Sequence, residues 1–246
     1  MLKRKGFLIV FEATDSCGKE TQAKELYHRL LSEGKEVRMI SFPRYDKDSS
    51  DLVKMYLKGD FGDRAKDVNP RTASRCYAID RYESYKEDWE EFYLNGGILI
   101  MDRYTQSNMI HQGGTIKDLK ERNEFIDWVW NLEYTVYGLP IPDLIFFLDV
   151  PTQYSQKLIE YRKNKITNEN EKDILEKDIN HLQDSYDCAS SLAYKYKWIR
   201  IKCVNTNQLR SIQDIANEIY FKATFKIDSQ NLYIDKINEV LISNNK

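Results

Sequence analysis

Five short segments of nearly unbroken apolar sequence occur along the chain, and longer stretches with helical spacing separate most of them. The segments are Phe7–Phe11, Val37–Phe42, Ile98–Met101, Leu144–Val150 and Trp198–Val204. Their β-branched and aromatic content, without polar alternation, is typical of strands buried on both faces of a parallel sheet. The order of strands and helices predicts an α/β fold with a five-stranded parallel sheet flanked by helices on both faces.

The intervening stretches carry helix start and stop signals. Asn69 and Pro70 supply a cap and a first-turn proline, and Gly34 marks the end of the first helix. The expected helices are Thr21–Ser32, a helix from Asn69 to about Leu94, Lys117–Tyr137, Gln153–Arg162, Asp173–Tyr196 and a last one from Asp214. With 246 residues, 41% of them hydrophobic, one domain is expected over residues 1–222, followed by a C-terminal extension, residues 223–246, that is helical and then frayed.

Charge and cysteine usage argue against several classes of protein, although the charge leaves a local basic site open. The net charge of -2 argues against a protein held to nucleic acid or to a membrane by bulk charge. The four cysteines are far apart and form no CxxC pair, so reduced thiols in the cytoplasm are expected rather than disulfides or a zinc site. The first apolar run ends at Glu12, which is too soon for a signal peptide or a membrane span.

A phosphate-binding loop of Walker A type follows the first expected strand. Its residues are Ala13, Thr14, Asp15, Ser16, Cys17, Gly18, Lys19, Glu20 and Thr21, and a helix follows. Such a loop directs backbone N–H groups and a helix N-terminus at phosphate oxygens, and its lysine reaches the β and γ groups of ATP. Two positions depart from the common pattern: Ala13 replaces a glycine, and Glu20 replaces the hydroxyl residue that touches magnesium.

The loop and four further segments, in this order, resemble the thymidylate kinase family over roughly residues 5–220. These segments are FEATDSCGKETQ, Phe42-Pro43-Arg44-Tyr45, Tyr77 to Arg81, Asp102-Arg103-Tyr104 with Asn108, and the run from Gly138 to Asp143 before Leu148-Asp149. The resemblance implies a P-loop nucleoside monophosphate kinase that transfers the γ-phosphoryl group of Mg·ATP to dTMP, giving dTDP. It also implies a homodimer, for which the Trp128-Val129-Trp130 segment and Tyr-rich helical faces offer apolar area, although core packing is the default explanation.

The resemblance assigns the catalytic centre to the end of the third expected strand, where open α/β sheets bind ligands. Arg103 would lie between the donor and acceptor phosphates, and Asp102 would hold Mg²⁺ or its waters. Glu20 is a second candidate for the metal, because a carboxylate is a hard oxygen ligand. The alternative is a structural Asp-Arg ion pair at the end of a strand.

A second group of residues is expected to bind dTMP. Tyr77 would stack on thymine, while Arg81, four residues further on the same helical face, would donate to the 4-oxo group and disfavour cytosine. Asn108 would read the base edge, although Tyr77 in the core and Arg81 in a surface ion pair would explain the same residues. Asp15 would approach the deoxyribose 3′-OH, or be an incidental loop residue.

Three further assignments concern the sugar and the acceptor phosphate. Phe42, Arg44 and Tyr45 follow the second strand and would bring an arginine to the phosphate and an aromatic ring to the sugar. Many relatives carry the arginine one position later, where this chain has Tyr45. His111 occupies a position near the 2′ carbon that is often aromatic, and a solvent-facing histidine is an equal alternative.

The last assignment is the lid, at about residues 162–172. Because the phosphate loop has Ser16 and Cys17 where some relatives carry an arginine, Arg162 is expected to supply the transition-state cation, with Lys163 and Lys165 beside it. A solvated loop without a catalytic part would have the same composition. Two other functions stay open: a kinase for another nucleotide or deoxynucleoside, and a degenerate nucleotide-binding protein.

Overall fold

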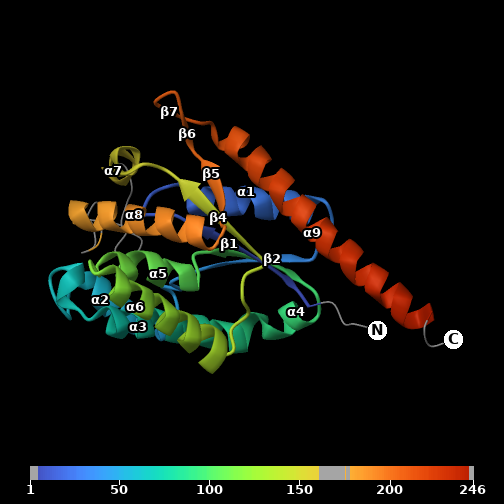
Figure 1. The fold of residues 1–246 in the computed structure, drawn as a ribbon, viewed down its shortest axis with the longest axis horizontal. Coiled ribbons are helices and arrows are strands. Elements are labelled where there is room, and N and C mark those ends of the chain that lie inside the picture. Colours follow the sequence, from blue (N-terminus) through green and yellow to red (C-terminus); the bar gives the residue numbers. More distant parts are fainter. Residues whose placement is uncertain (1–4, 161–174, 176–177, 244–246) are drawn as a thin grey trace.

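The computed structural model describes residues 5–160, 175 and 178–243. Its central sheet has five parallel strands: β1 (Phe7–Glu12), β2 (Val37–Ser41), β3 (Ile98–Asp102), β4 (Leu144–Asp149) and β5 (Ile199–Lys202). Their spatial order is β2-β3-β1-β4-β5 (Figure 1). The predicted fold class and all five strands are confirmed. Each observed strand lies within about two residues of the expected bounds.

Helices cover both faces of this sheet (Figure 1). On one face lie α1 (Lys19–Ser32) and α9 (Ile212–Ser243), and on the other lie α3 (Pro70–Ser84), α5 (Thr105–Gly114), α6 (Leu119–Trp130) and α8 (Ile179–Lys195). Side chains of the central strand β1 pack on both faces of the sheet. Phe7, Ile9 and Phe11 pack with α1 and α9. Leu8 and Val10 pack toward the opposite face. This two-sided burial explains the unbroken apolar runs.

Shorter elements complete the chain. They are the 3₁₀ turns η1 (Asp48–Ser50) and η2 (Ala65–Asp67), helices α2 (Asp51–Lys58), α4 (Glu90–Leu94) and α7 (Thr152–Glu160), the π-helical turns η3 (Tyr85–Trp89) and η4 (Asn131–Val136), and a hairpin of β6 (Val204–Asn205) and β7 (Gln208–Leu209). The two π turns are departures from the sequence prediction. The helix expected to reach Leu94 widens at η3, and the helix expected to reach Tyr137 widens at η4.

One further helix boundary differs from the expectation. Helix α8 begins at Ile179, not Asp173, because the Asp178 carboxylate accepts hydrogen bonds from the backbone N–H groups of Asn180 and His181 and so caps the helix. Helix α9 is continuous through residues 222 and 223, where an extension was expected to begin. The expected lid, residues 162–172, lies outside the described residues. None of the helices formed by the described residues has the length and apolar character needed to cross a bilayer.

Candidate active site

The phosphate loop connects β1 to α1 at the carboxyl edge of the sheet. Gly18, with φ of 77°, and Ser16, with φ of 55°, turn the chain so that α1 starts at Lys19. Ala13 is not among the described residues with positive φ, so the turn does not require the glycine that is common at its position. The loop lines a cavity of about 1030 Å³ together with Asp102 and Arg103.

Lys19 is buried at the base of this cavity. Its Nζ donates to the carbonyl oxygens of Thr14 at 2.6 Å and Ala13 at 3.3 Å. Burial, helped by the nearby charge of Arg103, lowers the pKa of Lys19 to about 8. A phosphate in the cavity would favour the charged form of the lysine, because an opposite charge at short range stabilises the ammonium.

Asp102 offers a carboxylate oxygen to the same cavity. Its Oδ2 accepts a hydrogen bond from Ser41 Oγ at 3.1 Å, whereas its buried Oδ1 has no hydrogen-bond partner among the described residues. Glu20 also lines the cavity, but its carboxylate pairs with Lys24 Nζ at 2.7 Å on the surface of α1. Within the described part of the chain, no three acidic, His or Cys side chains form a metal-binding group. A single unsatisfied carboxylate oxygen fits Mg²⁺ held mainly by phosphates and water.

Arg103 lies where the large cavity adjoins a smaller one of about 60 Å³, since both cavities are lined by Arg103 and Asp15. Its Nη2 contacts Asp15 Oδ1 at 2.5 Å, and its Nη1 lies 3.0 Å from His111 Nε2. The residue has φ of 72°, and its backbone N–H donates to the Phe11 carbonyl at 3.1 Å. This geometry places one guanidinium between the two cavities, and its role between donor and acceptor phosphates stays a prediction.

His111 is buried, so the solvent-facing alternative is wrong. Because a guanidinium only donates, we assign His111 Nε2 as the acceptor and place the proton on Nδ1. Burial is the main cause that lowers the pKa of His111 to about 3, and its ring stacks on that of His181 at 5.8 Å between centroids. The neutral imidazole fills space beside Arg103 and Asp15 without adding charge.

The smaller cavity contains the residues expected to bind the base. Tyr77, Arg81, Asn108, His111 and Gln112 line it. Arg81 is 1% exposed, so the alternative of a surface ion pair is wrong for this arginine. The ring of Tyr77 meets that of Tyr56 edge-on at 6.3 Å between centroids. At about 60 Å³ the cavity is smaller than typical ligand sites, so its side chains must move to admit a nucleotide.

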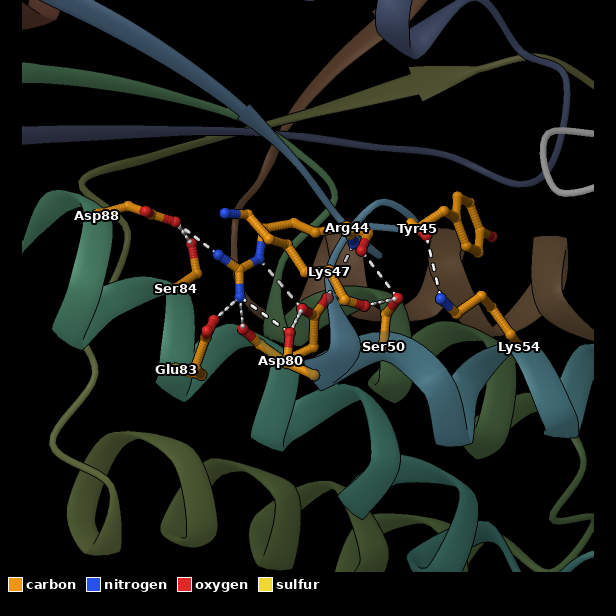
Figure 2. Close-up of polar contacts among 10 residues, drawn as sticks. Arg44, Tyr45, Lys47, Ser50, Lys54, Asp80, Glu83, Ser84 and Asp88 are labelled. Atoms are coloured by element: carbon orange, nitrogen blue, oxygen red, sulfur yellow. Dashed lines mark hydrogen bonds and ion pairs between the residues drawn. The ribbon is translucent and has the colours of Figure 1, made fainter.

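Arg44 lies among acidic side chains (Figure 2). Its Nε donates to Asp80 Oδ1 at 3.1 Å, its Nη1 contacts Asp88 Oδ2 at 2.5 Å, and its Nη2 contacts Glu83. Three carboxylates therefore compete with any phosphate for this guanidinium. The contacts anchor the segment after β2 to α3, and the acceptor-phosphate role of Arg44 stays a prediction. Phe42 and Tyr45, its neighbours, line both cavities.

Two buried carboxylates, Glu12 and Glu133, were not predicted from the sequence. Glu12, at the end of β1, accepts hydrogen bonds from the Tyr104 backbone N–H at 2.9 Å and from Ser107 Oγ at 2.7 Å. Burial raises its pKa to about 7, although nearby Arg103 acts in the opposite direction. Glu133 makes a two-pronged ion pair with Arg81. Glu12 could have been found, because an acidic residue at the end of an apolar strand is a signal of a functional carboxylate. Glu133 carries no such signal, since its role depends on contact with Arg81, 52 positions away in the sequence.

A loop that presents a buried lysine at the carboxyl edge of a parallel sheet is the phosphate-binding device of the P-loop nucleotide kinases. A second, smaller cavity adjoins the first at Arg103. We therefore assign the protein to the P-loop nucleoside monophosphate kinases. Arg162, expected to act from the lid with Lys163 and Lys165, lies outside the described residues.

Comparison with known proteins specifies the family. Residues 11–229 match the thymidylate kinase family model, and the chain belongs to that family. It is 28% identical over 222 residues to the thymidylate kinase of Plasmodium falciparum, covering 90% of this chain and 91% of that one. It is 28% identical to the enzyme of Dictyostelium discoideum, covering 92% and 89%. The human enzyme is 29% identical over 61% of this chain and 64% of its own length.

Proposed function

We propose that this protein is an ATP-dependent kinase that transfers the γ-phosphoryl group of ATP to dTMP, giving dTDP for dTTP synthesis. The observation that carries the proposal is the position of Arg103, which lines both the cavity of the phosphate loop and the cavity of Arg81 and Tyr77. A family match over residues 11–229 supports the same reaction. Phosphoryl transfer depends mainly on alignment and charge neutralisation, and the junction of these cavities provides both.

The side chains of the larger cavity are proposed to bind ATP, the metal and the transferred phosphoryl group. Lys19 and the loop would bind the phosphates of ATP, and Arg103 would neutralise charge on the transferred group. Asp102 would hold Mg²⁺ through its Oδ1, which no residue in the described part of the chain contacts by a hydrogen bond. The metal supplies charge neutralisation on the phosphate oxygens. Arg162 stays the proposed lid cation, because the described part of the loop offers Ser16 and Cys17 at the positions where some relatives carry an arginine.

The acceptor site is proposed from the smaller cavity. Tyr77 would stack on the base, Arg81 would donate to the 4-oxo group and Asn108 would lie beside it. Asp15, held by Arg103, would accept from the 3′-OH of the sugar, with His111 and Phe42 packed nearby. The pairing of Asp15 with Arg103 couples the sugar contact to the catalytic arginine.

We also propose that the protein acts in the cytoplasm as a homodimer formed through α3. Four side chains on this helix share one face by their spacing: Arg71, Arg75, Ile79 and Tyr82. Ile79 is 46% exposed and Tyr82 is 36% exposed. Both arginines lie over the ring of Trp128, which belongs to the apolar segment expected at a dimer interface. A second copy of the chain would cover the exposed Ile79 and Tyr82 on this face.

A panel of acceptors tests the proposed function against the other two candidates. We expect product formation from dTMP with Mg·ATP, weaker turnover of dUMP, and little from dCMP, AMP or thymidine. Preference for another acceptor would identify a different nucleotide kinase. Binding without turnover of any acceptor would indicate a degenerate nucleotide-binding protein.

A further inference from the structure

Glu133 lies on η4, the π-helical turn that ends α6, and it is fully buried. Its Oε2 accepts from Arg81 Nε and its Oε1 accepts from Arg81 Nη2, both at 2.6 Å. A third bond comes from Thr105 Oγ1, which donates to Oε2 at 2.9 Å. Single π turns inside helices occur frequently at functional sites. Here the wide turn directs a carboxylate inward against the cavity arginine.

The hydrogen bonds of Arg81 leave one side of its guanidinium available. Its Nε and Nη2 donate to Glu133, and Nη2 also donates to Asn108 Oδ1. Because an arginine carries five N–H donors, the two on Nη1 remain, and no described residue accepts a hydrogen bond from them. Arg81 lines the smaller cavity, so the Nη1 edge is the part of the guanidinium left for a ligand there.

The same ion pair sets the orientation of two amide side chains. Since Arg81 only donates, the oxygen of Asn108 must face it, and Asn108 Nδ2 then donates to Gln112 Oε1 at 2.7 Å. Within the described residues nothing accepts from Gln112 Nε2, and Gln112 also lines the cavity. The chain of bonds that starts at Glu133 thus presents N–H donors to the cavity from both Arg81 and Gln112.

We propose that Glu133 is a positioning residue for acceptor selectivity. It fixes Arg81 so that the Nη1 edge of the guanidinium can donate to the 4-oxo group of a pyrimidine and disfavours a pyrimidine with a 4-amino group. The inference rests on the proposed dTMP kinase function. A 4-oxo group offers an acceptor to these donors, whereas a 4-amino group brings further donors against them. Fixed orientation matters because an unpaired arginine side chain has many rotamers, and holding it in place beforehand removes that entropic cost from binding.

Charge supports the same role. Burial by itself would lower the pKa of Arg81, but the charge and hydrogen bonds of Glu133 outweigh it and raise the pKa. The guanidinium therefore stays charged inside the protein. A purely structural Glu133 would only neutralise this charge, so its loss would lower stability and reduce the use of every acceptor to the same extent.

The test compares dUMP with dCMP, which differ at the 4 position and in the N3 proton that accompanies it. Dissociation constants are measured by calorimetry for wild type, Glu133→Gln and Glu133→Asp, with melting temperatures and dTMP kinetics in parallel. Glu133→Gln removes the charge and leaves Arg81 unpaired. Glu133→Asp keeps the charge, and so tests the idea if the first variant folds poorly, but its shorter side chain cannot hold both nitrogens.

The matched control is Asp149→Asn. Asp149 pairs with Arg200 Nε at 2.8 Å and accepts from Tyr186 OH at 2.8 Å, and it lines neither cavity. We expect the preference for dUMP over dCMP to fall by at least about tenfold in both Glu133 variants, with KM for dTMP raised and KM for ATP unchanged. The control should keep the wild-type ratio.

An unchanged ratio of the two dissociation constants in a folded Glu133 variant would overturn the proposal, as would an equal loss of affinity for both nucleotides. The readout is binding, so it does not depend on turnover. The two proposals can also fail separately. If the wild-type protein does not phosphorylate dTMP but binds dUMP in preference to dCMP, and the Glu133 variants lose this preference, the proposed function is refuted while the role of Glu133 is supported.

Discussion

At the scale of single residues, the account depends most on Arg103. Its guanidinium contacts Asp15 and His111 at the junction of the two cavities. A lysine in its place would keep a positive charge but lose the planar fork that can contact two groups at once. The catalytic role therefore predicts a large effect from a substitution that is chemically small.

We predict that Arg103→Lys lowers kcat by about 10²–10³, as the loss of a preorganised charge contact typically does. The melting temperature should change little, because one charge replaces another. Arg200→Lys is the control, since Arg200 pairs with Asp149 outside both cavities. Steady-state kinetics with dTMP decide the matter, and a kcat within threefold of wild type would remove Arg103 from the mechanism.

Lys19 gives a pH-dependent prediction. Its pKa in the ligand-free protein is about 8, chiefly because of burial, and the protonated form is the one that binds phosphate. Deprotonation above pH 8 should weaken the binding of Mg·ATP by about tenfold between pH 7 and pH 9. The same lowered pKa costs the folded state stability below pH 8, and this cost disappears as pH rises toward 10.5.

Calorimetric titration with Mg·ATP at pH 7, 8 and 9 measures this effect. Lys19→Met should bind more weakly but with a flat pH profile over the same range, because it has no titrating group at this position. A slope of equal size in the variant would assign the titration to another group.

The sequence identified most of these residues, but not all. Lys19, Asp102 and Arg103 were found because each belongs to a short motif beside a strand end. Glu12 and Glu133 were missed because their partners lie 92 and 52 positions away in the sequence, and only the fold brings them together. Local spacing also gave no sign that Arg44 would face three carboxylates.

At the scale of elements, α9 combines two different parts. Ile215, Ile219, Ala223 and Ile227 face the core with α1 and the sheet. Further along, Leu232 and Tyr233 are 59% and 68% exposed, and the helix extends beyond the body of the molecule (Figure 1). Burial thus ends near Ile227, a few residues after the boundary expected at 222 and 223.

We predict that Ile219→Ala lowers the free energy of unfolding by about 2–5 kcal/mol, because Ile219 is fully buried. A chain ending at Gln230 should keep the wild-type melting temperature and kcat, since the described side chains removed are largely exposed. Thermal and chemical denaturation provide the comparison. A truncated chain that melts as early as the Ile219 variant would show that the outer part of α9 has a structural role.

The elements themselves were predictable to different degrees. The five strands were found because they are buried on both faces, which makes their sequence continuously apolar. Helix α5 was missed because nine of its ten residues are buried, yet they include Gln, Asn, His and two glycines, so burial is not marked by apolar residues along its sequence. The turns η3 and η4 were missed because a π turn changes the hydrogen bonding of a helix without interrupting its sequence pattern.

At the scale of the whole molecule, the sheet order β2-β3-β1-β4-β5 puts β1 and β3 side by side. The phosphate loop after β1 and the Asp102-Arg103 pair at β3 therefore meet at one edge. Strand periodicity alone predicted a parallel sheet but not this order. The resemblance to the thymidylate kinase family implied the architecture, because strand order depends on long-range connections that local patterns do not report.

The proposed homodimer gives a prediction at this scale. Ile79→Glu should convert a dimer into a monomer, since a charge on the exposed face of α3 opposes apolar contact with a second copy. Phe225→Glu is the control, because Phe225 is 70% exposed on α9, away from that face. Light scattering after size-exclusion chromatography reports the mass. A wild-type monomer, or a dimer lost only in the control variant, would contradict the proposed interface.

The most direct test of dTMP kinase activity is an ADP-release assay of the purified 246-residue chain with dTMP and Mg·ATP, with the dTDP product verified by chromatography. The account predicts dTMP-dependent turnover that forms one dTDP for each ADP and falls by about 10²–10³ in Arg103→Lys. Turnover no greater than the background without dTMP, from protein that is folded and binds ATP, would contradict it.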